Sequence, residues 1–351
     1  MLKFIDGFDH YNTSQLQAGR KWNVNIAGGY PQITSTNTRF GTGSAAVCNN
    51  TSAAFSKLFA AVSTVIVGFA FRIEYGPGSQ DTVISFYDNN AQNTQVSVII
   101  GTMGALIVKR GIHSGTVLGS CSIAMAQNVW YYVEIKLTIN STTGTVQIKI
   151  NGQTALNLTG QNTQSTSNAT VDTVTFNSDS PNGGAGFGPG GTVRYDDIYI
   201  CDTTGPNNNN FIGDIKVASL FPTASGAFAQ FTPSGAATNW QCVSENPADD
   251  DSSFVQTSTI GNEDTYVFQS ISASATINGI QFDVQSRKAD GGARTLTPVT
   301  RIGGTDYISG TINLTDTYLI NTVILENNPS TSGSWVPSGI NNAQFGYRLI
   351  G

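Results

Sequence analysis

Hydrophobic and polar positions alternate with a period of two over short runs of the chain, which is the pattern of half-buried β-strands. In the run WYYVEIKL, every second residue from Val133 onward is apolar, and the residues between, Glu134 and Lys136, are charged. Asn151-Gly152 is a strong hairpin signal because both residues tolerate positive φ. In the first part of the chain this pattern predicts strands within residues 1–5, 39–48, 63–76, 81–88, 94–101, 104–111, 128–140, 141–156, 171–178 and 192–202.

The pattern breaks once and then resumes. The stretch DTTGPNNNN (202–210) contains no apolar residue, so it indicates a linker or an exposed corner. We therefore predict a first domain over 1–204, a linker over 205–212 and a second domain over 213–351. Strand patterns in the second domain fall within residues 211–222, 265–289, 295–312, 317–329 and 342–351, with a Gly303-Gly304 turn signal.

Composition supports an all-β protein. The chain has 351 residues, enough for two domains. Charged residues make up 11%, against about 25% in a typical domain. The chain holds 38 glycines, and no stretch shows sustained helical spacing of apolar residues. We predict two antiparallel β-sandwich domains.

The net charge and the absence of long apolar runs exclude several classes of binding partner. The net charge is −6, and the 17 basic residues are scattered, so neither nucleic acid nor an anionic membrane surface is an expected partner. No apolar run is long enough to span a membrane, and the opening residues do not read as a signal peptide. Four cysteines without paired spacing are expected to be buried free thiols.

Three motifs of the first domain carry a family resemblance. They are FGTGSAAV (40–47), then WYYVEI (130–135) with TGTV (143–146) and ING (150–152), and finally YDDIYI (195–200). In this order they resemble the concanavalin A-like (laminin-G-like) jelly-roll superfamily. The resemblance implies a lectin-like jelly roll for the first domain.

The whole chain also resembles a group of tailed-bacteriophage virion proteins. The segments that carry this are LKFIDGFDHY (2–11), YDDIY (195–199), GDIKV (213–217), WQCV (240–243) and the aspartates 249–251. The resemblance implies a virion protein made in the host cytoplasm, with copies of itself and other virion proteins as partners. It implies a tail, fibre or adaptor component, and a capsid decoration protein is an alternative.

Enzymatic activity is not expected from the motifs. Glycoside hydrolysis needs two carboxylates flanking the scissile bond. Glu74, Glu134 and Glu245 have no acidic neighbours at strand spacing. The chain has no G-x-S-x-G elbow, and its two histidines, His10 and His113, are more simply surface or packing residues.

No cofactor is expected, and calcium is the one metal for which the chain offers candidates. Asp196 and Asp197 form one pair, and Asp249, Asp250 and Asp251 form a run. Calcium takes oxygen ligands of this kind. Adjacent strand residues point to opposite faces, so the pair could share a site only at a bulge. The simpler interpretation is that these carboxylates cap loops or face solvent.

Carbohydrate binding is the alternative function, with host-surface glycan as the partner. Such a site combines an aromatic side chain with polar partners. Most aromatic residues lie inside predicted strands and are expected in the core. The aromatic residues next to loops are Tyr30, Tyr75, Tyr87 and Trp335, and packing is the simpler role for each.

Overall fold

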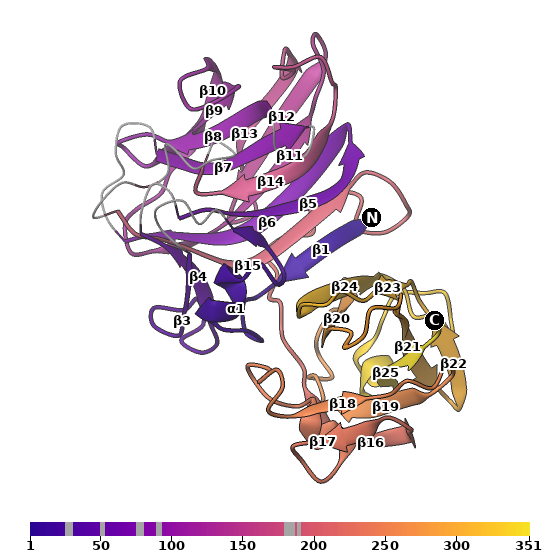
Figure 1. Ribbon diagram of the computed structural model, residues 1–351. Coiled ribbons are helices and arrows are strands. Elements are labelled where there is room, and N and C mark those ends of the chain that lie inside the picture. Colours follow the sequence, from indigo (N-terminus) through magenta and orange to yellow (C-terminus); the bar gives the residue numbers. More distant parts are fainter. Residues whose placement is uncertain (25–30, 50–52, 75–80, 89–92, 179–186, 188–190) are drawn as a thin grey trace. The chain divides into compact units, whose positions relative to one another are not determined.

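The computed structural model describes residues 1–24, 31–49, 53–74, 81–88, 93–178, 187 and 191–351. The chain forms two compact units, Met1–Val217 and Ala218–Gly351 (Figure 1). The all-β prediction is confirmed, because both units are built from antiparallel strands. No helix among the described residues is long and apolar enough to cross a membrane.

The first unit is a sandwich of two antiparallel sheets (Figure 1). In the part of the chain that the structure describes, the first sheet has the order β13 (Gln153–Gln161), β12 (Gly144–Ile150), β11 (Trp130–Thr138), β6 (Thr64–Ile73), β15 (Val193–Asp202), β4 (Ala45–Cys48) and β3 (Gln32–Thr34), with β1 (Leu2–Asp6) also paired to β15. The second sheet has the order β10 (Thr116–Ala124), β9 (Ala105–Arg110), β8 (Asn93–Ile100), β7 (Asp81–Asp88), β14 (Val171–Phe176), β5 (Phe55–Val62) and β2 (Asn23–Val24).

Aromatic side chains join the two sheets. Phe69 of β6 packs edge-on against Phe176 of β14, with 5.4 Å between ring centroids. Phe55 of β5 packs against Tyr195 of β15 at 5.6 Å. All four rings are fully buried. Because these residues occupy alternate positions on their strands, the other set of positions on each strand points out of the sandwich.

Most strands of this unit follow the sequence pattern. The predicted Asn151-Gly152 turn joins β12 to β13, with φ of 49° and 78°. The sequence pattern did not predict β3 of the first sheet, nor β2 and β5 of the second sheet. All four cysteines are buried and none is in a disulfide, as expected.

The opening segment LKFIDGFDHY packs around a buried cluster of polar contacts centred on Asp6, which we call the Asp6 cluster. The buried Asp6 carboxylate accepts hydrogen bonds from the Tyr11 hydroxyl at 2.6 Å and the Trp22 indole at 2.5 Å, and Lys21 pairs with it at 3.2 Å. The helix α1 (Thr13–Gln17) follows and begins with a capping box at Asn12. Packing therefore accounts for the residues of this segment.

The second unit is a smaller sandwich around its own core. Its larger sheet has the order β16 (Pro222–Ala229), β19 (Glu263–Phe268), β25 (Gln344–Leu349), β21 (Thr295–Ile302) and β22 (Thr305–Ile308), with β23 (Ile312–Asn313) paired to β21. Further described elements are the pairs β17 (Thr232–Ser234) with β18 (Phe254–Gln256) and β20 (Ile280–Ser286) with β24 (Leu319–Leu325), the 3₁₀ turn η1 (Asn239–Cys242) and the helix α2 (Pro337–Asn341).

The structure of the second unit confirms one sequence-based prediction and adds strand pairings that the local pattern did not indicate. The Gly303-Gly304 turn joins β21 to β22, as predicted. The strand pattern predicted within 265–289 corresponds to two strands in different sheets, since β19 pairs with β16 and β25 whereas β20 pairs with β24. The pairing partners are set by long-range contacts, which the local pattern does not contain.

The unit boundary lies after Val217, later than the predicted linker over 205–212. The segment is polar, yet it is tied to the first unit. The Met1 ammonium group donates to the Asn208 carbonyl at 3.3 Å, and Lys136 donates to Asn210 at 3.2 Å. The Lys149 ammonium lies 4.7 Å from the Phe211 ring centroid. These contacts hold the polar segment against the sandwich, so it does not act as a free spacer.

Candidate functional site

The outer face of the first sheet carries three rows of side chains set by strand register. Trp130 of β11 lies opposite Arg72 of β6, which lies opposite Arg194 of β15. Parallel to this row run two others, one of Tyr132, Ala70 and Asp196 and one of Glu134, Gly68 and Tyr199. These polar residues alternate with the core residues of the same strands, so all three rows face away from the second sheet.

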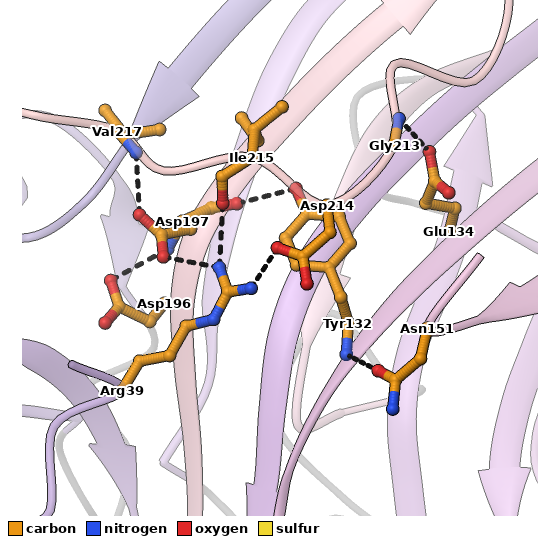
Figure 2. A network of polar contacts seen from close by, with 10 residues as sticks. All are labelled: Arg39, Tyr132, Glu134, Asn151, Asp196, Asp197, Gly213, Asp214, Ile215 and Val217. Carbon is orange, nitrogen blue, oxygen red and sulfur yellow. Dashed lines mark hydrogen bonds and ion pairs between the residues drawn. The ribbon is translucent and has the colours of Figure 1, made fainter. Parts of the chain in front are cut away.

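The row of Glu134 is closed over by the segment 211–217, which we call the cover segment. Glu134 accepts a hydrogen bond from the Tyr199 hydroxyl at 2.6 Å. It also accepts one from the Gly213 amide at 2.8 Å (Figure 2). The Ile212 amide donates to the Tyr199 hydroxyl at 3.2 Å. Gly68 leaves room for the Tyr199 ring, since a Cβ there would lie 2.1 Å from a ring carbon. Glu134, expected on a polar face, is consequently buried.

Asp196 and Asp197 lie at a bulge of β15, the condition under which they could share a site. The register shifts between Asp196 and Tyr199, and Asp197 has a φ of 48°. The Asp197 carboxylate accepts from the Arg39 guanidinium and from the Val217 amide, both at 2.7 Å (Figure 2). Arg39 also donates to the Ile215 carbonyl at 2.7 Å. The bulge therefore serves as the anchor of the cover segment.

Burial and mutual repulsion shift the acidity of this pair. Burial first, and the neighbouring Asp197 carboxylate second, raise the pKa of Asp196 to about 9. Burial also raises the pKa of Asp197, although the Val217 amide and Arg39 oppose it. The Asp197 amide donates to Asp196 at 2.8 Å. Arg39 also pairs with the Asp214 carboxylate, so one guanidinium group is shared between Asp197 and Asp214.

The calcium candidates are not brought together as a metal site. No group of three or more histidine, cysteine or acidic side chains among the described residues is arranged to hold a metal ion. In the second unit the three aspartates diverge. Asp249 accepts from Ser253, Asp250 accepts from Gln285, and Asp251 pairs with Arg287. This arrangement matches the simpler interpretation, in which these carboxylates serve loop hydrogen bonds.

The row of Trp130 occupies the next outward-facing position of β11, β6 and β15 after the row of Tyr132. The indole nitrogen of Trp130 donates to the Asn37 carbonyl at 3.2 Å, which holds the half-buried ring in one orientation. The Asn37 amide donates to Glu74 at 3.0 Å, and the Arg194 guanidinium grips the same carboxylate at 2.7 and 3.0 Å. We call Trp130, Arg72, Arg194, Glu74, Asn37 and Asn128 the Trp130 patch.

The electrostatics of the Trp130 patch centre on one carboxylate between two guanidinium groups. Arg72 lies 3.3 Å from Glu74 and donates to the exposed Asn128 side chain at 3.4 Å. Burial raises the pKa of Glu74, but Arg194 and Arg72 outweigh burial and hold the pKa below its usual value. The carboxylate is therefore ionised at neutral pH, and both arginines stay fixed around it.

Sequence reasoning missed this patch. Of the four aromatic residues named as loop-adjacent, Tyr30 and Tyr75 lie outside the described residues, and Tyr87 and Trp335 are buried. Trp130 was assigned to a strand interior and hence to the core. Its place at the start of β11, opposite an arginine, follows from pairing with β6, which the local sequence does not reveal.

Comparisons with known proteins describe the arrangement of strands. No protein-family model matches the chain, and no curated relative matches it either. Among solved structures, the chain is similar to the alginate lyase Aly36B (12% identity, TM-score 0.35, covering 57% of this chain and 96% of that one). It is also similar to the carbohydrate binding module CBM66 from Bacillus subtilis (11%, 0.33, 50% and 92%) and to the alginate lyase vAL-1 from Chlorella virus (12%, 0.36, 56% and 99%).

These comparisons correct one expectation and leave another as it was. The chain was expected not to be an enzyme, and that exclusion is wrong as drawn, because alginate lyases are among the similar structures. The search for paired carboxylates addresses hydrolysis alone. At these identities and scores, the likeness assigns neither an activity nor a ligand to this chain. The virion assignment stays a prediction.

Proposed function

We propose that this protein binds carbohydrate at the Trp130 patch of its first unit. The observation that carries the proposal is a half-buried indole with a fixed orientation, beside guanidinium, carboxylate and amide groups on the same end of the sheet. The buried rows of the same face have no such opening. Of the rows on this face, that of Trp130 therefore offers a ligand both an apolar surface and polar partners.

The chemistry of the patch suits a sugar ring. An aromatic face packs against the C–H side of a pyranose, and fixed polar groups orient its hydroxyls. Glu74 is an acceptor, Arg72 is a donor, and the exposed Asn128 amide supplies both functions. Because Asn37 and Arg194 hold the indole and the carboxylate in place, little conformational entropy is lost on binding.

The setting we propose is the virion of a tailed phage, as an adhesion or structural component. The support is the resemblance of the opening segment and of GDIKV (213–217) to such proteins. In the structure these segments have packing roles, since Asp6 is the centre of the Asp6 cluster and the Val217 amide donates to Asp197. Their resemblance to virion proteins therefore supports a shared fold more directly than it supports a position in the virion. Copies of this chain and other virion proteins are the proposed partners.

The test of carbohydrate binding is a glycan array probed with the full chain, followed by calorimetry on the best ligand. We expect Trp130→Ala to abolish detectable binding, because the stacking surface is lost. Trp130→Phe keeps an aromatic face and should retain part of the affinity. Tyr318→Ala is the matched control, since Tyr318 is a surface aromatic of the second unit that also lies against an arginine.

Two outcomes would contradict the proposal. One is the absence of any glycan ligand for the full chain. The other is a ligand whose affinity is unchanged in Trp130→Ala, which would place binding elsewhere. For the virion setting, the parent particle can be probed with antibodies against this chain. Absence of the chain from purified particles would reject that setting without touching the binding proposal.

A further inference from the structure

We infer that the glycan bound at the Trp130 patch is acidic, with a carboxylate or sulfate group received by Arg72 and Arg194. This inference rests on the proposed carbohydrate binding and names its substrate class.

The patch contains donors that lack acceptors. Buried polar atoms in folded proteins almost always have a hydrogen-bond partner, and each exception calls for a reason. Among the described residues, the buried atoms without a hydrogen bond include Nη1 of Arg194, and also Nε of Arg72, whose one printed contact is the 3.3 Å ion pair with Glu74. The Oγ1 atom of Thr38, the neighbour of Asn37, is a third. Three of the seven such atoms among the described residues therefore lie in the Trp130 patch or next to it, and all three can donate, whereas three others lie on β7 of the second sheet.

The charge of the patch is unbalanced in the same sense. Two guanidinium groups share the single Glu74 carboxylate, so the local charge is positive in a chain whose net charge is −6. Arg194 is 93% buried, since 7% of its surface is exposed. A buried cation that is only partly paired is disfavoured. An anionic ligand would supply the missing charge and the missing acceptors together.

The positions of the two arginines suit one anionic group. They are direct partners on neighbouring strands, which lie about 4.8 Å apart. Planar guanidinium groups bind carboxylate and sulfate oxygens in pairs. Trp130 is the partner of Arg72 on the other side. A sugar ring stacked on the indole would therefore place a ring substituent beside Arg72.

The experiment compares acidic and neutral glycans on one array. The array carries uronate-containing, sialylated, sulfated and neutral oligosaccharides, and the best acidic ligand is then compared with its carboxyl-reduced or desulfated form. We expect binding to the acidic members alone, weakened at high salt. Arg72→Gln should lower the affinity about tenfold or more, because a hydrogen bond to a charged group is lost. Arg72→Lys should recover part of it.

Controls separate this inference from the proposed function. Arg110→Gln removes an arginine from the second sheet of the same unit and should leave binding unchanged. Equal binding of acidic and neutral forms, lost in Trp130→Ala, would overturn the acidic class and keep carbohydrate binding. No binding of any member would overturn both. Inorganic sulfate is titrated alone, and tight sulfate binding without a preference for acidic glycans would assign the donors to a free anion.

Discussion

Two parts of the outer face of the first sheet differ in how far their polar side chains are buried and hydrogen-bonded. Around Glu134 and Asp197, the cover segment supplies backbone amides and closes the face (Figure 2). Around Trp130 and Arg72, neighbouring side chains satisfy one another incompletely and the indole stays half exposed. Both parts lie on the same strands, β11, β6 and β15.

The difference teaches how polarity should be interpreted on such a sheet. A buried charge that is fully paired holds structure together, and its loss is felt as lost stability. In the open part, donors without hydrogen bonds lie beside the half-exposed indole, and a ligand bound at that ring would supply acceptors to them. Substitutions in the closed part should therefore change the free energy of unfolding, and substitutions in the open part should change binding.

The largest expected effect is that of Arg39→Ala in the closed part. We expect a loss of about 3 kcal/mol in the stability of the first unit, because Asp197 would stay buried without its cation. Urea unfolding, with hydrogen exchange at β6 and β15 to report on this unit, measures the loss. Arg72→Ala is the matched control, expected to lose less than about 1 kcal/mol since Arg194 still pairs with Glu74. Equal losses would erase the distinction between the two parts.

Next in size is Gly68→Ala. The added methyl group would meet the Tyr199 ring, whose hydroxyl is bonded to Glu134. We expect a loss of about 2 kcal/mol from overpacking. Gly101→Ala is the comparison, because the nearest atom there is the end of the Ile107 side chain at 3.3 Å. The thermal midpoint reports both variants, and a silent Gly68→Ala would show that the ring moves freely.

Asp196→Asn tests whether burial of this carboxyl group in the closed part makes the free energy of unfolding depend on pH. The folded-state pKa of Asp196 is raised to about 9, so the unfolded chain releases this proton first, and wild-type stability falls between about pH 4 and pH 9. This fall is the slope that the titration of Asp196 contributes. The variant cannot titrate there and should lose that slope, gaining on the wild type as pH rises. Unfolding curves from pH 5 to 8 test this, with exposed Asp316→Asn as control; parallel curves for wild type and Asp196→Asn would refute it.

The smallest effect is expected at the acidic run of the second unit. Asp251 is exposed, and burial hardly enters its pairing with Arg287 and Tyr318. Asp251→Asn should leave the thermal midpoint of this unit unchanged. Addition of calcium, or its removal with a chelator, should also shift neither unit. A clear calcium-dependent rise that is absent in Asp251→Asn would restore the metal site.

The sequence by itself determined the fold class and most strands of the first unit. Alternation over WYYVEIKL placed Val133 in the core, and the Asn151-Gly152 and Gly303-Gly304 dipeptides set hairpins. These features are local, because strand period and turn conformation depend on a few neighbouring residues. The sequence also named Asp196 and Asp197 as a pair that would need a bulge, and a bulge is present.

Only the tertiary structure decided which polar residues are buried and which stay open. The same alternation that placed Glu134 on a polar face could not show that Gly213, far along the chain, would close over it. Nor could it place Trp130 beside Arg72 and Arg194, since strand order and register join residues that are distant in sequence. Burial of a polar side chain depends on what returns to cover it, and that is a property of the folded chain.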